Sequence, residues 1–443
     1  MDTGILFPVS NGMNEEFLKN IHTAHFVGIG GIGVSALARI MLLKGAYVTG
    51  SDRERSIIIE KLEEDGAKIF IGHNATNVPE NCDLVVYSPA IAMDNPELVV
   101  ASESEAKVFS YPRVLGILSE GMRTIAVSGT HGKTTTTAMI SEILVGAKLS
   151  PTVVVGSLLK KTGTNFILGT SNLFVVEACE YQRSFINLSP DILAITNIDN
   201  DHLDYYGTIE GVQKAFAEFV EKVPANGAIV CDPNDPFVAP VLVNATARIV
   251  DYTKENIIVP LQITGDHNKK NAKVAIAIAK ILGVDGIEAT RLLALFGGTW
   301  RRMELKGKIK NGALVYDDYA HHPTEIKATL QGFRAKYFKW RLVVVYQPHL
   351  YSRTKTLLND FAQSFGDADE VIVAPIYAAR EAPDPEISSE VLAEAIRAHN
   401  PNVHVGSNFS EIENYLRDTI TPNDVIITMG AGDIYKVGES LLG

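Results

Sequence analysis

The sequence predicts an α/β protein with three domains: a Rossmann-like N-terminal domain, a central P-loop-type ATPase domain and a C-terminal Rossmann-like α/β domain. Short runs rich in β-branched residues alternate with helical stretches along most of the chain, which is typical of βαβ units in parallel sheets. Glycine-rich turns follow two of the predicted strands. The length of 443 residues suits about three domains of roughly 150 residues each.

The first predicted domain spans residues 1–122. We expect its boundary within Gly116–Arg123, a segment that contains two glycines. A helix is predicted over 34–43. The strands of this domain are predicted at 25–29, 46–50, 68–71 and 83–87.

The second predicted domain spans 123–300 and the third spans 301–443, with the break marked by Gly297–Thr299. The small and apolar residues of 268–282 predict a helix. The strands have few polar interruptions, which predicts sheets that are covered on both faces. They are expected at 124–127, 172–177, 191–197 and 227–231 in the second domain, and at 314–317, 342–346, 370–374 and 425–428 in the third.

The chain is acidic, because 40 Lys and Arg stand against 52 Asp and Glu and give a net charge of −12. This balance argues against a nucleic-acid binder or a protein of membrane surfaces, so neither kind of partner is expected. An anionic ligand would need local devices to hold it. These would be backbone N–H groups, a few placed cations or a metal ion.

Cysteine usage and the N-terminus indicate the compartment. The residues Cys82, Cys179 and Cys231 form no CxxC pair, which argues against a disulfide framework or a structural zinc site and favours a reducing compartment. The N-terminal segment lacks the pattern of a signal peptide. No apolar run reaches the roughly 20 residues that span a bilayer. We therefore expect a cytoplasmic protein, either a monomer or a weak dimer.

A glycine turn, GIGGIG, lies between the first predicted strand and a helix. GxGxxG spacing lets the backbone approach a diphosphate, and the helix N-terminus supplies N–H donors. Asp52 follows the second strand, about where an acid that binds ribose would lie. Taken alone, this turn predicts an NAD-dependent oxidoreductase, and the alternative without a ligand is tight strand–helix packing. The candidate residues of the turn are Gly28, Gly30, Gly31, Ile32 and Gly33.

A second glycine loop, SGTHGKTT, follows the strand predicted at 124–127. It is shorter than a Walker A loop, but its glycines expose backbone N–H groups, Lys133 offers a charge to phosphates, and the hydroxyl of Thr134 is suited to Mg²⁺. The alternative is a threonine-rich helix cap. Two phosphate loops fit an enzyme that binds ATP and a second phosphorylated ligand. The candidate nucleotide-binding residues are Gly129, Thr130, His131, Gly132, Lys133, Thr134 and Thr135.

Acidic residues and a histidine follow two further strands. Glu177 and Glu180 come at the end of one strand, and TNIDNDHLD, which contains His202, follows the next. Ligands of open α/β sheets bind beyond the carboxyl ends of the strands, and carboxylates are the natural ligands of hard cations. For a single acid here, a helix N-cap is the simpler interpretation. For Glu177 with His202, the phosphate loop upstream favours metal binding.

These motifs together resemble the Mur ligase family of ATP-dependent amide-bond synthetases, and the resemblance covers nearly the whole chain. The motifs DDYAHHPTE and QPHLYSRT make it specific to members that act on UDP-N-acetylmuramate. The motifs that carry it are GIGGIG at 28–33, SGTHGKTTT at 128–136, TNIDNDHLD at 196–204, GDHNKKNA at 265–272, RRME at 301–304, DDYAHHPTE at 317–325, QPHLYSRT at 347–354 and GAGDI at 430–434.

The resemblance implies a division of roles along the chain. The first domain would bind the UDP-sugar, the second ATP, and the third would close on the nucleotide and place the amino acid. For the UDP-sugar the resemblance implies Gly28–Gly33, His73 and Ser88, and for the amino acid it implies Tyr319, His321 and Arg353. For ATP it implies Lys133 at the phosphates, Asn268 and Asn271 at the adenine region, and Arg302 and Asp318 at the nucleotide. For magnesium it implies Thr134 and Glu177 at one ion and His202 at a second. His321 is also a candidate for the group that takes the amine proton.

The implied reaction joins L-alanine to UDP-N-acetylmuramate with ATP, through an acyl phosphate, in the cytoplasmic stage of peptidoglycan synthesis. A ligase that adds a preformed murein peptide is the alternative within the family. Leu350 stands where an arginine is usual, which leaves the amino-acid specificity open, and EACEYQRSF and Ala320 are smaller departures from the family pattern. Lys214 lies near the position of a lysine that is carboxylated in some relatives, but its register leaves that role unassigned.

Overall fold

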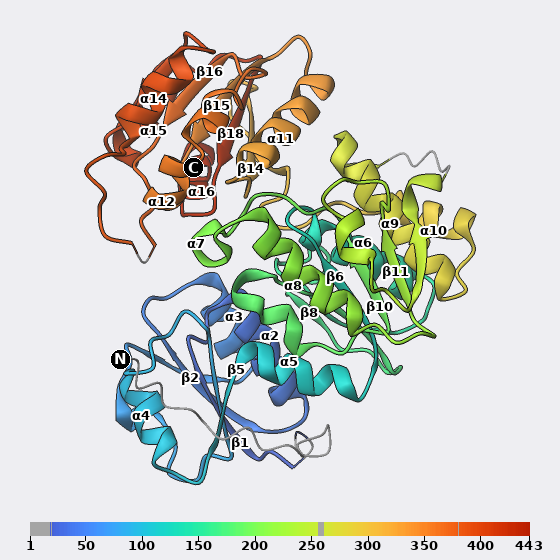
Figure 1. Ribbon diagram of the computed structural model, residues 1–443. Helices are drawn as coiled ribbons and strands as arrows, with labels where there is room; N and C mark the ends of the chain where they lie inside the picture. The colour runs from blue at the N-terminus through green and yellow to red at the C-terminus, as the bar shows by residue number, and fades with distance from the viewer. Residues whose placement is uncertain (1–17, 19, 256–260, 380) are drawn as a thin grey trace. The chain divides into compact units, whose positions relative to one another are not determined.

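The computed structural model describes residues 18, 20–255, 261–379 and 381–443. The N-terminal segment that lacks a signal-peptide pattern lies mostly outside this range. The chain forms two compact units. The first comprises the chain up to Leu158, Thr162–Ile198 and Glu210–Tyr252, and the second comprises Leu159–Lys161, Asp199–Ile209 and Thr253–Gly443. The first unit holds two β-sheets and the second unit holds a third (Figure 1).

The first sheet has five parallel strands in the order β3-β2-β1-β4-β5. The order reverses between β1 and β4, which is the kind of switch point where open sheets bind ligands. The strands are β1 (Thr23–Val27), β2 (Tyr47–Asp52), β3 (Lys68–Ile71), β4 (Leu84–Tyr87) and β5 (Lys107–Ser110). The helices are α2 (Ile32–Leu43), α3 (Ile57–Glu64), α4 (Pro96–Ser102) and α5 (Tyr111–Glu120).

The second sheet has seven strands in the order β12-β11-β10-β6-β9-β7-β8, and only the β7–β8 pair is antiparallel. Its central strand, β6, leads into the second glycine loop. The strands are β6 (Arg123–Ser128), β7 (Thr152–Val154), β8 (Phe166–Ile167), β9 (Leu173–Glu177), β10 (Ile192–Ile195), β11 (Ala228–Cys231) and β12 (Arg248–Asp251). The main helices here are α6 (Lys133–Gly146) and α8 (Ile209–Glu221).

The third sheet has the order β13-β14-β18-β15-β16-β17, with β13 antiparallel to β14 and all other pairs parallel. The strands are β13 (Glu304–Lys308), β14 (Leu314–Asp318), β15 (Arg341–Tyr346), β16 (Glu370–Val373), β17 (Val403–Val405) and β18 (Asp424–Met429). The helices of this unit are α7 (Leu203–Tyr206), α9 (Asp266–Ile281), α10 (Gly286–Leu293), α11 (Pro323–Lys336), α12 (Tyr351–Thr356), α13 (Leu358–Ala362), α14 (Ser389–Arg397), α15 (Phe409–Thr419) and α16 (Tyr435–Leu442).

Alternate residues of the third sheet enter two separate cores. Leu342 and Val344 of β15 pack in one cluster with residues of α11 and α14, while Val343 and Val345 pack in another with residues of α15 and α16. Successive side chains of a strand point to opposite faces, so this sheet is covered on both sides. The prediction of buried sheets from the apolar strands is therefore confirmed for this unit.

The predicted strands are all present, with shifts of one or two residues at their ends. Six strands were not predicted, namely β5, β7, β8, β12, β13 and β17. They are short, and most lie toward the sheet edges, where partly exposed residues give no continuous apolar run. β17, for example, has only three residues, and its central His404 is exposed.

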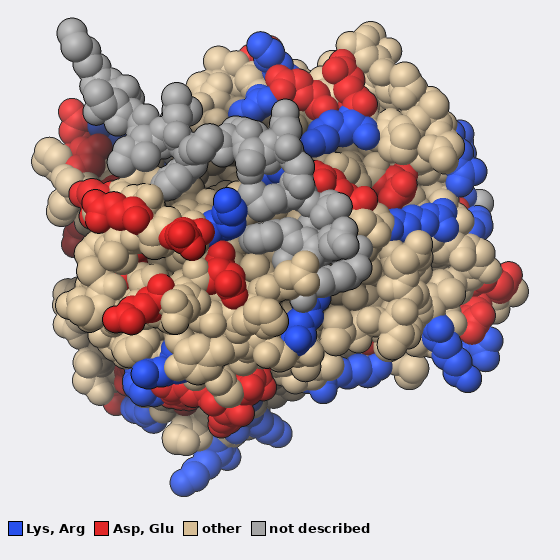
Figure 2. All heavy atoms as spheres, turned by 90° about the horizontal axis from the view of Figure 1, so that it is seen from below, with Lys and Arg blue, Asp and Glu red and all other residues tan. Residues whose placement is uncertain are grey.

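The described surface and helices bear on the expected partners. Acidic and basic side chains are interspersed on the face drawn in Figure 2, and no continuous basic surface is visible there. None of the described helices is both long and apolar enough to cross a membrane. The three cysteines are free thiols.

A buried carboxylate ties together the strand ends of the first sheet. Glu97 of α4 is 0% exposed, and it accepts hydrogen bonds from Asn77 at 2.6 Å and from the Ser51 hydroxyl at 2.5 Å. His73 and His25 lie 3.3 and 3.6 Å from the same carboxylate. Burial alone would raise the pKa of Glu97, but the nearby ring of His25 and the hydrogen bonds from Ser51 and Asn77 outweigh it and lower the pKa to about 2.

This cluster predicts a specific loss of stability in acid. The folded-state pKa of Glu97 lies below its ordinary value of 4.5, so its stabilisation is present above pH 4.5 and is lost as the pH falls toward 2. Above pH 4.5 this carboxylate adds about 3 kcal/mol to the free energy of unfolding. Urea unfolding of the wild type and of Glu97→Gln between pH 7 and pH 2 measures it. The free energies of unfolding should converge in acid, and parallel curves would contradict the assignment.

Candidate active site

The second glycine loop connects β6 to α6 in a conformation that only glycine tolerates. Gly129 has φ +130°, and a Cβ there would lie 2.1 Å from the Thr196 hydroxyl oxygen. Gly132, with φ +82°, is the N-cap of α6 and provides no side-chain cap. The first N–H groups of α6, which begins at Lys133 and continues through Thr134 and the buried Thr135, are therefore free of a capping side chain. This arrangement is suited to an anion.

The loop is held from the end of β10. The backbone N–H groups of Thr130 and His131 donate to the carbonyl and side-chain oxygens of Asn197 at 3.0 and 2.9 Å. The Thr196 hydroxyl and the Asn197 amide donate in return to the His131 carbonyl at 2.6 and 3.0 Å. The start of the TNIDNDHLD motif thus shapes the phosphate loop. This positioning role cannot be predicted from the motif, because it depends on contacts between residues 66 positions apart.

Lys133 lies inside the loop. Its ammonium nitrogen donates to the carbonyls of Gly129 and Thr130 at 2.6 and 3.0 Å and to Glu180 at 2.9 Å. Burial on its own would lower the pKa of Lys133, but the carboxylate of Glu180 outweighs burial and raises the pKa above its ordinary value. Lys133 is therefore a fixed positive charge beside the N-terminus of α6.

Thr134 and Glu177, the two residues predicted to offer oxygen ligands to a metal ion, lie next to each other. The Thr134 hydroxyl lies 2.9 Å from one oxygen of Glu177, and the other oxygen accepts from the Gly156 N–H at 2.6 Å. A hydroxyl in the first turn of α6 and a carboxylate at the end of β9 are hard oxygen ligands, which Mg²⁺ prefers. Their chemistry fits a magnesium ion. His202, the ligand expected for a second ion, lies in the second unit, where it caps α7 with φ +54°.

The GIGGIG turn lies at the carboxyl edge of the first sheet. The Gly30 N–H donates to Asp52 at 2.8 Å, and the other Asp52 oxygen accepts from the Arg53 N–H at 2.7 Å. Gly31 is the uncapped N-cap of α2, which begins at Ile32. A Cβ on Gly33 would lie 2.4 Å from the ring of Tyr111. Asp52 therefore stabilises the turn by accepting the Gly30 N–H, and the absence of a side chain on Gly33 lets Tyr111 pack closely against it.

The two weaker candidates of the first unit lie at the same edge of the sheet. A Cβ on Gly28, which has φ +79°, would lie 3.2 Å from the Cβ of Ser88, so Ser88 lies against the turn. The Ser88 N–H donates to the carbonyl of Val27 at 3.1 Å. His73 belongs to the Glu97 cluster, with its Nδ1 2.9 Å from the Ser51 hydroxyl. The structure thus gathers the sugar-site candidates around the ends of β1, β2 and β4.

In the second unit, Asp318 at the end of β14 holds the segment that contains Arg302. Its two oxygens accept from the N–H groups of Met303 and Ala320 at 2.7 and 2.8 Å. Burial raises the pKa of Asp318 to about 6, although Arg302 opposes the shift. Arg302 lies over the ring of Tyr319 at 5.0 Å. The three candidates Arg302, Asp318 and Tyr319 are thus together.

Asn268 and Asn271 are buried in the first two turns of α9. The Asn268 amide donates to the Thr264 carbonyl at 2.6 Å and lies 3.8 Å from the sulfur of Met303. Asn271 lies 3.4 Å from Asn268. The pair expected near adenine is thus connected, through Met303, to the segment that Asp318 holds.

Arg301 is a residue of this site that the sequence analysis did not single out. It is 3% exposed, and it donates to Asp317 at 2.7 Å and to the carbonyls of Gly432 and Gly430 at 2.7 and 2.6 Å. The GAGDI motif therefore accepts hydrogen bonds from Arg301, the first arginine of RRME. The sequence shows two adjacent arginines but does not distinguish their roles. The contacts of Arg301 within the fold identify it as structural, in contrast to Arg302.

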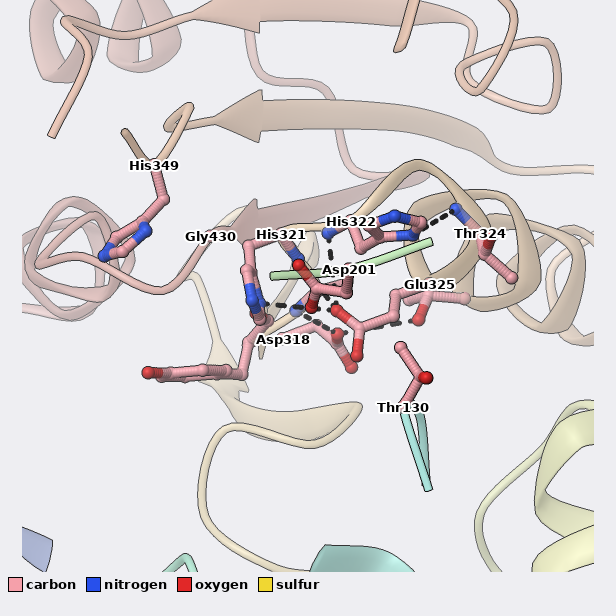
Figure 3. Close-up of polar contacts among 12 residues, drawn as sticks. Thr130, Asp201, Asp318, His321, His322, Thr324, Glu325, His349 and Gly430 are labelled. Carbon is pink, nitrogen blue, oxygen red and sulfur yellow. Dashed lines mark hydrogen bonds and ion pairs between the residues drawn. The ribbon is translucent and has the colours of Figure 1, made fainter. Parts of the chain in front are cut away.

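The amino-acid candidates His321 and Arg353 lie near Asp201 in the second unit (Figure 3 shows His321 and Asp201). The Nδ1 of His321 is 3.1 Å from the Tyr319 carbonyl and 3.3 Å from Glu325. Burial lowers the pKa of His321 to about 3, so its ring is neutral at pH 7. Arg353 pairs with Asp201 at 2.9 Å. A neutral imidazole and a fixed guanidinium are thus available on one side of this unit.

The sequence matches three models of one family. They are "Mur ligase family, catalytic domain" over residues 23–123, "Mur ligase middle domain" over 127–256, and "Mur ligase, glutamate ligase domain" over 301–432. The chain is also 42% identical over 449 residues to the UDP-N-acetylmuramate–L-alanine ligase of Clostridium acetobutylicum, with 94% of this chain and 97% of the relative covered.

Solved structures agree with the sequence matches. The UDP-N-acetylmuramate–alanine ligase of Thermotoga maritima has a TM-score of 0.81 at 28% identity, and a murein peptide ligase of Psychrobacter arcticus has 0.71 at 27%, each with 95% of this chain and 98% of that chain covered. The chain belongs to the Mur ligase family, whose three-domain α/β fold it has. The oxidoreductase alternative is therefore wrong. The family uses ATP, so ATP is the nucleotide of this enzyme.

The geometry of the phosphate loop predicts that Gly129→Ala impairs nucleotide binding. The added Cβ would collide with Thr196, and the backbone would be strained at φ +130°, which typically costs about 1–3 kcal/mol. We expect the KM for ATP to rise about tenfold. Gly66→Ala is the matched control, because Gly66 has φ +105° but open space around its Cβ position. A KM for ATP that changes equally in both variants would contradict the steric argument.

Proposed function

We propose that this chain joins L-alanine to the lactyl carboxylate of UDP-N-acetylmuramate, with hydrolysis of ATP to ADP and phosphate, in the cytoplasmic stage of peptidoglycan synthesis. The observation that carries the proposal is the phosphate loop, in which Lys133 is fixed beside the N-terminus of α6 and next to the Thr134–Glu177 pair. The relatives' names supply the substrates. Residues 1–122 serve the UDP-sugar, 123–300 serve ATP, and 301–443 serve the nucleotide and the amino acid.

The first chemical step brings two anions together. The muramate carboxylate attacks the γ-phosphorus of ATP, which gives an acyl phosphate and ADP. At about 4 Å and an effective dielectric constant of about 20, each pair of unit charges repels by about 4 kcal/mol. Lys133 and the N–H groups of α6 offset this repulsion and the charge that builds on the transferred phosphoryl group.

Magnesium fits this step through Thr134 and Glu177, with His202 as the residue for a second ion. An ion held there would supply positive charge that offsets the charge of the phosphates. Arg302 and Asp318, with Asn268 and Asn271, serve the nucleotide in the second unit. The buried contacts of Asp318 with Met303 and Ala320 keep this segment in place for that task.

In the second step the amine of L-alanine attacks the acyl carbon, and the tetrahedral intermediate loses phosphate. The amine loses one proton, and the ring of His321 is the candidate acceptor, although burial lowers its pKa to about 3 and so makes it a weak base. Its Nδ1 faces the Tyr319 carbonyl, so the tautomer protonated there leaves Nε2 as the acceptor. Arg353 binds the carboxylate of the amino acid.

The family alternative, addition of a preformed murein peptide, has less support. The Clostridium relative carries the L-alanine name, and the alanine ligase structure has the higher TM-score, 0.81 against 0.71. Leu350 is buried with φ +71° and stands where alanine-adding enzymes usually carry an arginine, so this position does not itself favour L-alanine over a peptide.

An amino-acid panel tests the substrate directly. ADP release is measured on mixing the enzyme, UDP-N-acetylmuramate, ATP and Mg²⁺ with L-alanine, glycine, L-serine or a murein tripeptide. We expect the highest kcat/KM with L-alanine, because relatives that match nearly the whole chain carry the L-alanine name and a single small zwitterion matches one arginine. Preference for the tripeptide would favour the alternative.

The role of the loop cation is tested with Lys133→Ala. ATP-dependent phosphate release should fall by about 10³-fold or more, because the charge that opposes phosphate repulsion is lost. The variant leaves Glu180 buried without its cation, so the double variant with Glu180→Gln checks that the loss is not due to unfolding. Lys280→Ala, which removes an exposed ion pair with Glu255, is the control. Full activity of Lys133→Ala in a thermally stable protein would overturn the assignment.

A further inference from the structure

A cavity of about 320 Å³ lies in the second unit between the turn before α7 and helix α12. Leu203, Leu350 and Leu357 supply its apolar wall, and Asp201, His202 and Arg353 are among its polar lining residues. Arg353 is the single Lys or Arg among the described residues that line this cavity. The charge balance of the cavity therefore depends on what pairs with Arg353.

The partner of Arg353 is Asp201, which lies 152 residues away in the sequence. The Nη2 of Arg353 is 2.9 Å from the Oδ1 of Asp201, and the two side chains are each only 9% exposed. The same Asp201 oxygen accepts from the His202 N–H at 2.8 Å, and the Nη1 of Arg353 lies 3.2 Å from the Nδ1 of His349. The guanidinium is thus fixed on two sides within a buried wall.

This pairing leaves binding capacity on Arg353. A guanidinium has five N–H donors, and the contacts to Asp201 and His349 use two of them. An arginine that is already oriented loses little side-chain entropy when it accepts a carboxylate ligand. Asp201 therefore prepares Arg353 for a ligand carboxylate and does not merely neutralise it.

The pairing also sets the net charge of the wall. One carboxylate and one guanidinium cancel, so a ligand that is itself neutral overall adds no unpaired charge. A zwitterionic amino acid meets this condition, whereas a ligand with a second carboxylate would bring an unpaired charge into a partly apolar cavity, which is costly.

We infer that Asp201 is a positioning and selectivity residue of the amino-acid site. Its carboxylate orients the guanidinium of Arg353 for the α-carboxylate of the amino acid. It also cancels the charge of Arg353, which disfavours amino acids that carry a second carboxylate. The inference rests on the proposed function, since it takes this cavity as the amino-acid site. It assigns a role to the first acid of the DHLD sequence that differs from metal binding.

The test is the variant Asp201→Asn, assayed by ADP release with L-alanine, ATP and UDP-N-acetylmuramate varied in turn. We expect the KM for L-alanine to rise about tenfold, with kcat and the other two KM values within about threefold. Loss of kcat with an unchanged KM for L-alanine, or equal changes for all three substrates, would overturn the inference. Asp384→Asn is the control, because it removes a carboxylate from an exposed ion pair with Lys355, two residues from Arg353.

A second readout separates selectivity from folding. The ratio of kcat/KM for L-aspartate to that for L-alanine should rise at least about fivefold in Asp201→Asn and stay at the wild-type value in Asp201→Glu, which keeps the charge. If Asp201→Asn is thermally unstable, Asp201→Glu alone decides: a raised KM for L-alanine with an unchanged ratio supports the inference, and an unchanged KM overturns it. A wild-type enzyme without L-alanine-dependent ADP release would instead refute the proposed function.

Discussion

The active site depends on the ammonium group of Lys133, held between the carbonyls of the phosphate loop and the carboxylate of Glu180. A chain with a net charge of −12 offers phosphates no overall attraction, so a positive charge has to be fixed where phosphates are to bind. The ion pair keeps the lysine protonated although it is buried. The loop that surrounds it is shaped by Asn197, which is 66 residues from His131 in the sequence. The end of β10 therefore determines where the charge of the β6 loop lies.

In the second unit, two buried arginines are also held by carboxylates. Arg301 and Arg353 are both buried and both paired with an aspartate that fixes the direction of the guanidinium. Arg301 has its remaining contacts with backbone carbonyls, so its role is structural. Arg353 keeps further donors beside a cavity, which supports our proposal that it binds a carboxylate. The same residue type thus serves two purposes, and the difference lies in what the remaining N–H groups meet.

The sequence was sufficient to predict the central strands and both glycine loops, because these depend on local patterns. Buried parallel strands form continuous apolar runs, and glycines mark places such as Gly129 where a Cβ would collide. The edge strands were missed since β17 and β8 have only three and two residues. The fixed order of strand, glycines, lysine and hydroxyl also predicted the loop between β6 and α6, for which nucleotide binding is our proposal.

What the sequence determined by itself was therefore the α/β class, the central strands and the chemistry of the residues at their ends. The tertiary structure alone decided which partners those residues have: Asp52 braces the GIGGIG turn, Glu97 collects hydrogen bonds from three segments, and Asp201 pairs with Arg353. The physical reason is that strand and turn formation depend on neighbours along the chain. Ion pairing and burial depend on residues that only folding brings together.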